Sequence, residues 1–324
     1  MTVFLVRRCL QAGLVMLAMS LIVFVGVYAI GDPVEILIAP DADQAERERA
    51  VRALGLDQPL WLQYLVFLRN AVRGDLGRSF VFNEPALQLI VHRVPATLEL
   101  AFGAMILALV VGLPLGLYAG LRPGARLSSA IMTGSILGFS LPGFWVGLML
   151  IMIFSVELGW LPSTGRGETV SVLGLRWSFL TWDGLQHLAL PMLNLALFKI
   201  SLVIRLARAG VRENMLMDYV KFARAKGLSP ARVTLVHVCK NIMIPIVTVV
   251  GLELGSTIAF SVVTETIFAW PGMGKLIIDS INVLDRPVMV AYLMVIVVMF
   301  VVINLVVDLL YTALDPRVRL GGRA

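Results

Sequence analysis

Long apolar stretches recur along the chain and alternate with short polar segments. A helix needs roughly 20 apolar residues to cross about 30 Å of hydrocarbon. Six stretches meet this requirement, at residues 9–30, 100–121, 127–156, 185–204, 242–268 and 288–310. The pattern predicts an all-α membrane protein with about six transmembrane helices.

The first apolar stretch follows Arg7 and Arg8, as the core of a signal peptide follows basic residues. It is longer than a signal core and no small-residue cleavage site follows it, so we expect a retained span. Four later stretches contain prolines, which membrane helices tolerate where neighbours satisfy the freed backbone groups. These prolines, which favour bent and closely packed spans, are Pro114, Pro142, Pro191 and Pro245.

Basic residues are unevenly distributed among the polar segments. Residues 205–240 hold eight Lys and Arg against two acids, Glu213 and Asp218, and a segment of this kind stays in the cytoplasm. An even number of spans then places both termini in the cytoplasm, with the short loop that holds Arg122 and Arg126. Residues 31–97 hold seven arginines and nine acids and exceed the length over which positive charge retains a segment, so we expect them outside.

This topology divides the chain into four parts. We expect an N-terminal region with the first span at residues 1–30, an external segment at 31–97, and a membrane core at 98–312. The core includes a cytoplasmic loop at residues 205–241, and residues 313–324 form a cytoplasmic tail.

The external segment contains two predicted helices. Asp43 is suited to cap the N-terminus of a charged helix, AERERAVRAL, that stops near Gly55. Residues 60–72 form a second helix with an apolar face rich in aromatic residues, including Trp61 and Tyr64. This face predicts either a helix lying at the lipid interface or a docking platform for an external partner.

Composition agrees with a membrane protein and limits the functions to consider. Of the 324 residues, 59% are hydrophobic and 15% are charged, and mean hydropathy is +0.89, outside the soluble globular range. The net charge of +6 is typical of cytoplasmic Lys and Arg near anionic lipid, so we expect no nucleic acid partner. Cys9 and Cys239 fit no disulfide or metal spacing, and we expect them to be inert on the reducing side.

The sequence offers no catalytic chemistry. No G-x-x-x-x-G-K-[ST] loop is present, and the nearest approach, at residues 272–276, lacks the leading glycine and the hydroxyl residue. Three histidines, His92, His187 and His237, are scattered without ligand-like spacing, and no Ser/His/Asp set can be argued. We therefore expect no catalytic residue, no metal site, no bound cofactor and no ATP hydrolysis by this chain.

The basic segment has the local signals of two short helices joined by a tight turn. Residues 219–226 can form one helix, and Gly227 permits a backbone turn that a residue with a Cβ resists. Ser229 and Pro230 suit the N-cap and the first position of a second helix. Such a module can transmit rigid-body motion to the attached spans, whereas the alternative is a solvated basic loop held near anionic lipid.

The same segment carries a family resemblance. It reads DYVKFARAKGLSPARVTLVHVCKNIMIPIV and resembles the permease signature of ABC importers, with YV-x-x-ARAKGL and H-x-x-x-N-x-x-x-P similar to the oligopeptide/dipeptide/nickel branch. Where the broader signature begins Glu-Ala-Ala, this chain has Lys221, Phe222 and Ala223, so the leading Glu is absent. Further similar motifs are GDP at 31–33, LGLDQPLWLQY at 54–64, GDLGRS at 74–79, RVPATLEL at 93–100, TETIFAWPGMGKL at 264–276 and LVVDLLYTALDPRVR near the end.

The resemblance implies the type I permease fold of ABC importers, in the inner membrane of a bacterium. Implied partners are a second, different permease subunit, two ATP-binding subunits that carry ATP and Mg, a periplasmic substrate-binding protein, and membrane lipid. The implied cargo is a di- or oligopeptide, with nickel chelates, glutathione and oligosaccharides as alternatives. The residues implied to couple the permease to its ATPase are Tyr219, Lys221, Ala223, Arg224, Ala225, Lys226, Gly227, Leu228 and Ser229.

Charged residues inside the predicted spans need an explanation, because a charge at bilayer depth is costly. Glu253, near the middle of the fifth span, predicts either a path-lining group that meets a substrate amine or a structurally paired or protonated one. Lys199 lies six residues before Arg205, about 9 Å deeper, and we expect it to snorkel to the interface. Two charges at span ends are expected to be solvated, namely Glu99 and Asp308.

Residues near the outer end of the fifth span are candidates for a gate. Glu265 precedes the AWPGMG sequence and is predicted as a gate residue, the alternative being a simple interfacial charge. The complete set of path or gate candidates is Glu253, Thr257, Glu265 and Pro271.

Two functions of other classes compete with the importer hypothesis. An ATP-independent secondary transporter or channel would show midplane ion sites on broken helices and repeats between halves, and we find no such repeat. A membrane scaffold or receptor would use the external segment. Neither explains the basic loop and the external motifs together, and ATP dependence of uptake separates them from an importer.

Overall fold

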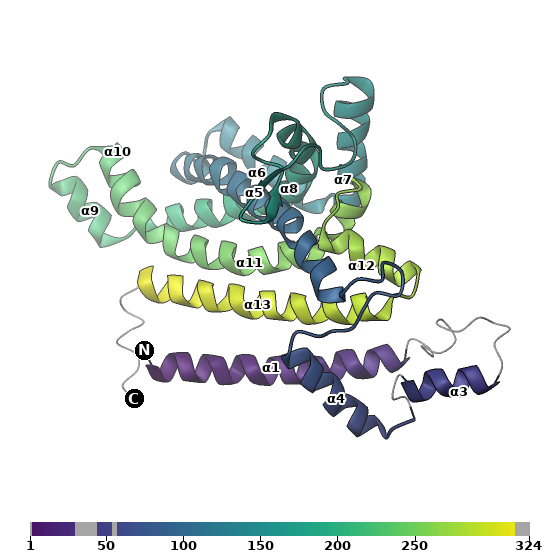
Figure 1. Cartoon of the computed structure of the whole chain (residues 1–324). Coiled ribbons are helices and arrows are strands. Elements are labelled where there is room, and N and C mark those ends of the chain that lie inside the picture. The colour runs from purple at the N-terminus through teal and green to yellow at the C-terminus, as the bar shows by residue number, and fades with distance from the viewer. Residues whose placement is uncertain (1, 30–43, 54–56, 315–324) are drawn as a thin grey trace. The chain divides into compact units, whose positions relative to one another are not determined.

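The computed structural model describes residues 2–29, 44–53 and 57–314, and nearly all of its secondary structure is helical (Figure 1). The chain divides into two compact units, one made of Met1–Pro95 and Gly272–Val302 and the other of Ala96–Pro271 and Ile303–Ala324. Predictions for residues 31–33, for Asp43, for Gly55 and for the tail after residue 314 lie outside the described residues. The predicted α class is confirmed.

The first unit is built from helices before residue 96 and from the start of the last helix. Both helices predicted in the external segment are present, and the second has the predicted bounds. The elements are α1 (Thr2–Ala29), α3 (Gln44–Ala53), α4 (Leu60–Val72), the start of α5 (Ala86–Leu121), α12 (Met273–Asn282) and the first part of α13 (Arg286–Leu314).

Helix α4 lies across α1 (Figure 1), and aromatic side chains make the contact. The ring centroids of Tyr64 and Phe67 lie 5.3 and 5.8 Å from that of Phe24, and the Tyr64 hydroxyl is 2.9 Å from the buried Ser20 Oγ. Trp61 on the same helix is 64% exposed. The predicted apolar face is therefore divided between a part that covers α1 and a part that is exposed, so the interfacial and docking interpretations both stand.

The segment between α4 and α5 is tied to the start of α13 by one buried carboxylate. The Ser79 hydroxyl donates to Asp285, and the backbone N–H of Phe80 donates to the same side chain at 3.2 Å. Asp285 is fully buried. This contact gives a structural reason for the serine that ends the GDLGRS motif.

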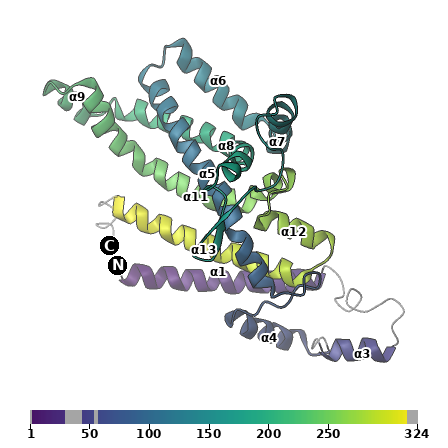
Figure 2. The same ribbon diagram turned by 45° about the horizontal axis from the view of Figure 1, so that its top comes forward.

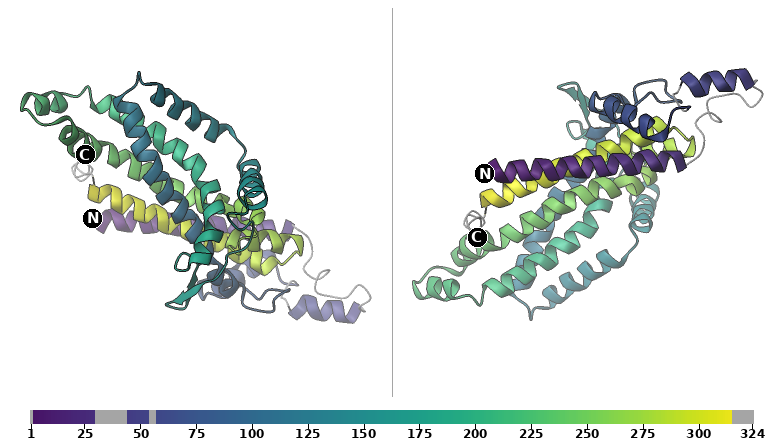
Figure 3. Two further views of the ribbon diagram at one scale, coloured as in Figure 1. Left: turned by 90° about the horizontal axis from the view of Figure 1, so that it is seen from above. Right: turned by 90° about the horizontal axis from the view of Figure 1, so that it is seen from below.

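The second unit is centred on α8, which contacts α6, α7 and α11. Figure 3 shows α6, α8 and α11 running alongside one another. The elements are the rest of α5, α6 (Arg126–Ser140), α7 (Gly143–Leu150), π-helical η1 (Ile151–Glu157), β1 (Val170–Val172), β2 (Leu175–Trp177), α8 (Trp182–Asn214), α9 (Asp218–Ala225), α10 (Pro230–Arg232), π-helical η2 (Val233–Val238), α11 (Cys239–Ile267) and the end of α13.

A glycine seam joins α5 to α8. Glycines at every fourth position of α5 face small or β-branched residues at every fourth position of α8, a pattern that lets membrane helices approach closely. A Cβ added at Gly116 would lie 2.6 Å from Ala207 Cβ and 2.7 Å from the Ile204 carbonyl oxygen. The facing pairs are Gly112 with Val203, Gly116 with Ala207, and Gly120 with Val211.

We predict that Gly116→Ala destabilises the protein by about 1–3 kcal/mol, the usual cost of overpacking, because neither facing atom can rotate away. Gly134 of α6 is the matched control, since a Cβ there meets none of the described residues within 4 Å and alanine favours the helix by up to about 1 kcal/mol. Unfolding in detergent followed by circular dichroism measures both variants. Equal stability of Gly116→Ala and Gly134→Ala would contradict the close approach.

Most of the predicted spans coincide with long apolar helices. Among the described residues, four helices are long and apolar enough to cross a membrane, and a bent pair makes a fifth if it counts as one span. The predicted first span corresponds to a shorter apolar stretch within α1, Leu10–Gly26. The four helices are Ala86–Leu121, Trp182–Asn214, Pro230–Ile267 and Arg286–Leu309.

The predicted span at residues 127–156 is not one straight helix. Helices α6 and α7 meet at an angle of 105°, with Leu141 and Pro142 at the break. Leu141 has extended backbone (φ −78°, ψ 135°), as expected for a residue whose helical conformation is hindered by the following proline ring. Pro191 and Pro245, by contrast, lie inside continuous helices.

Three structural details add to the predicted succession of spans and loops. Helix α5 begins at Ala86, so the predicted boundary at residue 97 falls inside a helix. Helix α8 continues to Asn214, because Ala207 and Val211 bury an apolar stripe there, and the predicted loop from Arg205 is helical for its first ten residues. The chain also has one antiparallel hairpin, β1 with β2, within the otherwise helical part that the structure describes.

Candidate functional site

The predicted helix–turn–helix is present between α8 and α11. Helix α9 covers Asp218–Ala225, and Gly227 follows with φ +75°, a backbone conformation that suits glycine. The Ser229 side chain caps the next helix by accepting a hydrogen bond from the Arg232 backbone N–H at 3.4 Å, and Pro230 takes the first helical position. The local signals in the sequence were sufficient to predict this geometry.

Apolar packing fixes this module to the two long helices that flank it. Val220 and Ala223 on α9 are buried in a cluster with side chains from α8, η2 and α11. The Tyr219 hydroxyl also donates to Asn214 Oδ1 at 2.7 Å, at the end of α8. A force applied to α9 is therefore transmitted to α8 and α11 through close-packed side chains.

The opposite face of α9 is exposed and basic. Figures 2 and 3 show α9 at the end of α8 and α11 that is remote from α7. Of the predicted coupling residues, Ala223 is buried, Tyr219 and Leu228 are half-buried, and the others are exposed. Those exposed residues are Lys221, Arg224, Ala225, Lys226, Gly227 and Ser229.

Phe222 was not among the predicted coupling residues. Its side chain is 62% exposed, and the Lys226 ammonium lies 4.5 Å from its ring centroid. An exposed phenylalanine between basic residues offers an apolar anchor inside a charged surface. Its place inside the YV-x-x-ARAKGL motif, between Lys221 and Ala223, was the signal in the sequence.

A partly buried ion pair joins α8 to α11, with the Glu253 side chain 31% exposed. Lys199 Nζ is 2.5 Å from Glu253 Oε2 and 3.3 Å from Ser256 Oγ, and the Lys199 side chain is only 11% exposed. The expectation that Lys199 snorkels to the interface is therefore wrong, because its ammonium pairs with the Glu253 carboxylate of α11 instead. Of the two interpretations of Glu253, the structure supports structural pairing.

A cleft of about 420 Å³ opens beside this pair, between α7, α8 and α11. Lys199 and the predicted path residue Thr257 line it, while Glu253, Glu265 and Pro271 do not. Thr257 is buried and donates to the Glu253 carbonyl oxygen at 2.7 Å. The lining residues are Gly143, Phe144, Asn194, Leu195, Phe198, Lys199, Ser256, Thr257, Phe260, Val263 and Thr264.

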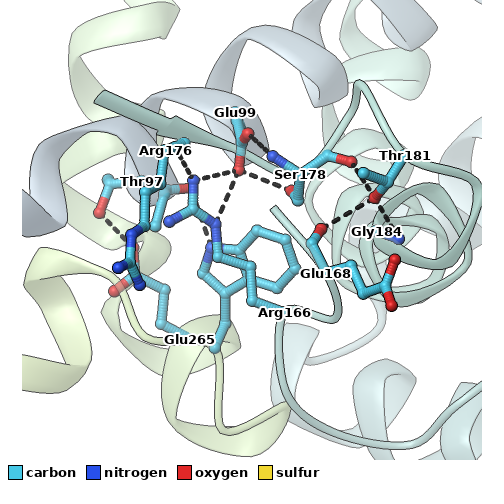
Figure 4. Close-up of polar contacts among 11 residues, drawn as sticks. Thr97, Glu99, Arg166, Glu168, Arg176, Ser178, Thr181, Gly184 and Glu265 are labelled. Carbon is cyan, nitrogen blue, oxygen red and sulfur yellow. Dashed lines mark hydrogen bonds and ion pairs between the residues drawn. The ribbon is translucent and has the colours of Figure 1, made fainter. Parts of the chain in front are cut away.

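Glu265 lies fully buried against the start of the second unit. Its carboxylate accepts a hydrogen bond from Thr97 Oγ1 at 2.7 Å (Figure 4). It also accepts one from Ser261 Oγ at 2.9 Å. Trp270, also fully buried, donates its indole N–H to the Ala96 carbonyl at 2.9 Å. A simple interfacial charge is therefore the wrong interpretation of Glu265, because water does not reach it.

A second buried carboxylate, Glu99, contradicts the expectation of solvation at span ends. Its side chain is fully buried, pairs with Arg166 Nη2 at 2.8 Å, and accepts from the Ser178 N–H and hydroxyl at 2.5 and 2.8 Å (Figure 4). Arg166 also donates to the Arg176 carbonyl at 2.6 Å and lies 5.8 Å from the Trp270 ring centroid. The cluster holds the hairpin-bearing loop before α8 against α5. Sequence reasoning missed it because Arg166 lies 67 residues from Glu99.

Comparisons with protein families match almost the whole chain. The family described as "Binding-protein-dependent transport system inner membrane component" matches residues 112–320. The family described as "Binding-prot-dependent transport system membrane comp, N-term" matches residues 1–101. The two matches lie on either side of a point within α5.

Curated relatives are similar over most of their length. The chain is 38% identical to the Di/tripeptide transport system permease protein DppB of Pseudomonas aeruginosa, covering 89% of this chain and 90% of the relative. It is 38% identical to the Oligopeptide transport system permease protein AppB of Bacillus subtilis, covering 98% and 99%. It is 37% identical to the Glutathione transport system permease protein GsiC of Escherichia coli, covering 98% of both.

A solved structure of an inward-facing MetNI methionine ABC transporter matches the fold with a TM-score of 0.57 at 18% identity. The match covers 72% of this chain and 99% of the solved chain. The fold is thus that of a membrane subunit of an ABC transporter. Together with the two family matches, this places the chain among the binding-protein-dependent transport system inner membrane components, the permease subunits of ABC importers.

Proposed function

We propose that this permease forms half of the translocation path for di- or oligopeptides, delivered by an external binding protein and driven by partner ATPases. The relatives named for di/tripeptide and oligopeptide transport support a peptide cargo. A relative named for glutathione transport makes that tripeptide the second candidate. Both cargoes share a peptide backbone.

The observation that carries the proposal is the anchored helix–turn–helix. Helix α9 presents exposed basic residues and Phe222 on one face and buries Val220 and Ala223 against the ends of α8 and α11 on the other. A partner that grips the exposed face moves two long helices together. The predicted coupling role of residues 219–229 rests on this arrangement.

The proposed topology places residues 215–232 in the cytoplasm, where an ATPase subunit is accessible. The eight basic residues at 205–240 favour that side. The hairpin and α9 flank opposite ends of α8, so the Glu99 cluster then lies on the outer side. A second permease subunit completes the path, and ATP and Mg are held by the ATPase subunits.

The proposed mechanism is alternating access. ATP binding draws the ATPases together and pulls on α9, which opens the path outward, and hydrolysis with product release returns it inward. Each ligand shifts this equilibrium only through its different affinity for the two states. The role of this chain is to convert motion of α9 into motion of α8 and α11.

Purification of the chain with the second permease and the ATPases encoded beside it tests the proposal. We expect Phe222→Asp to weaken association with the ATPases at least fivefold, because a charge replaces an apolar anchor, and burial of its 62% exposed surface contributes about 1–2 kcal/mol. Leu173→Asp is the matched control, since Leu173 is 98% exposed in the hairpin turn. Yield of the co-purified ATPase and peptide-stimulated ATP hydrolysis in proteoliposomes measure the effect.

Two results would oppose the proposal. Peptide uptake by this chain alone, insensitive to ATP, would identify an autonomous carrier or channel. Equal loss of ATPase association in Phe222→Asp and Leu173→Asp would mean that the exposed face of α9 is not the docking surface. Competition between a dipeptide and glutathione for uptake separates the two cargoes.

A further inference from the structure

Asn194, which lines the cleft between α7, α8 and α11, has a hydrogen-bond acceptor that the described residues leave unused. Asn194 is 7% exposed, and its Nδ2 donates to Thr264 Oγ1 at 2.9 Å. Its Oδ1 is buried and has no hydrogen-bond partner within the part of the chain that the structure describes. Leaving a buried acceptor unpaired costs about 1–3 kcal/mol, so such an atom calls for a ligand.

Lys199 supplies the complementary group in the same cleft. An ammonium has three N–H donors, and the structure engages them with two acceptors, Glu253 Oε2 and Ser256 Oγ. A further donor is therefore available without breaking the ion pair. A ligand that both donates an N–H and offers an oxygen can satisfy Asn194 and Lys199 together.

The spacing of these two groups suits a peptide backbone. Asn194 and Lys199 are five residues apart on α8, so their Cα atoms are separated by about 7.5 Å along the helix axis. Two residues of extended peptide span about 7 Å. Because both residues line the cleft, an extended peptide of this length that lies along α8 can meet both side chains.

The remaining walls of the cleft are suited to side chains of varied shape. Phe144, Phe198 and Phe260 line it with Leu195 and Val263, and the five polar lining residues are Asn194, Lys199, Ser256, Thr257 and Thr264. A volume of about 420 Å³ falls within the roughly 300–1,000 Å³ of small-molecule sites. The apolar walls offer no hydrogen-bond partner to the side chains of the ligand. Such a site recognises the peptide backbone and accepts different peptide side chains.

We propose that this cleft is a transit site for a short peptide, whose N–H group hydrogen-bonds to Asn194 Oδ1 and whose carbonyl or carboxylate binds Lys199. The inference rests on the proposed function, because the peptide enters through the assembled importer. Glu253 then acts as a positioning residue, which holds the Lys199 ammonium in place through their ion pair. Through this site the permease itself would contact the peptide, in addition to the contacts made by the binding protein.

The test is photolabelling of the assembled importer in proteoliposomes with a tripeptide that carries a diazirine side chain. We expect peptide-competed label on the segments around Phe144 and Phe260. Asn194→Leu, which keeps the number and branching of the side-chain heavy atoms, should reduce labelling and peptide uptake about fivefold, the value of one hydrogen bond. Thr248→Val, which removes a half-buried hydroxyl of α11 outside the cleft, should retain labelling.

A second variant keeps the test valid if Asn194→Leu assembles poorly. The double change Lys199→Gln with Glu253→Gln removes both charges together, so that no unpaired charge is left, and should also reduce labelling about fivefold. Co-purified ATPase measures assembly in every sample. Loss of label in Thr248→Val equal to that in Asn194→Leu would show a general structural effect and overturn the transit site.

The outcomes also separate this inference from the proposed function. Wild-type importer that takes up peptide with ATP, but labels outside the cleft or equally in Asn194→Leu, overturns the transit site alone. A photoreactive lipid that labels the cleft and is not displaced by peptide identifies a lipid headgroup site and also overturns it. Absence of peptide uptake in the wild-type importer overturns the peptide function and the inference with it.

Discussion

Replacing Glu99 by leucine is expected to lower the free energy of unfolding by about 3–5 kcal/mol, because the change leaves a buried charge without its partner. The Arg166 side chain is 10% exposed and would keep only the Arg176 carbonyl and the Trp270 ring as contacts among the described residues. The Ser178 N–H and hydroxyl would also lose their acceptor. Detergent-solubilised protein unfolded by heat, with circular dichroism as the signal, gives the measurement.

The double variant Glu99→Leu with Arg166→Met separates the ion pair from the packing around it. Removing both partners leaves no buried charge, and such replacements are often neutral or stabilising, so we expect most of the lost stability to return. If the double variant is as unstable as Glu99→Leu alone, the pair is not the source of the effect. In that case the Ser178 hydrogen bonds carry the stability of the loop.

The sequence was sufficient where the structural signal is local. Apolar runs predicted the long helices because burial in lipid demands about 20 apolar residues whatever the tertiary contacts. Gly227, Ser229 and Pro230 predicted the turn and the second helix because each acts on its own backbone or within one turn of helix. The structure places all three in the predicted roles.

The sequence was insufficient where the partner is distant. Whether Lys199 snorkels or pairs depends on Glu253, 54 residues away, and nothing in the local pattern shows that α11 brings that carboxylate within 2.5 Å. Glu99 was likewise expected to be solvated, because its partner Arg166 is 67 residues away in the sequence. A charge whose surroundings are set by tertiary packing cannot be placed from hydropathy alone.

The close packing of α5 and the bend at Pro142 both have a local signal in the sequence. The sequence GLPLGLYAG, at residues 112–120, has glycine at every fourth position, which is a known signal for close helix packing. The Leu141–Pro142 pair signals a break because a proline disfavours the helical conformation of the residue before it. Pro191 and Pro245 show why that signal is ambiguous, since both lie within intact helices.

Gly227→Val is expected to reduce ATP-driven uptake by at least tenfold while the chain still folds. Gly227 has φ +75° and open space around the position of a Cβ among the described residues, so the substitution strains only the backbone, at about 1–2 kcal/mol for an L-residue. Gly174 in the β1–β2 turn has φ +78° and the same open surroundings, which makes Gly174→Val a control for strain alone. The two variants carry the same backbone strain, but only Gly227 lies beside α9.

The turn at Gly227 sets the angle between α9 and the following η2 and α11. If the backbone relaxes to relieve the strain at this turn, the exposed face of α9 moves relative to α8 and α11. We therefore expect Gly227→Val to hydrolyse ATP without peptide stimulation, and Gly174→Val to retain uptake within about twofold, with both measured in the same proteoliposomes. Similar loss of uptake in the two variants would mean that the effect is one of stability. Full uptake in Gly227→Val would mean that the angle between the two short helices does not couple hydrolysis to transport, and the motion would then have to pass through the packed Val220 and Ala223 face alone.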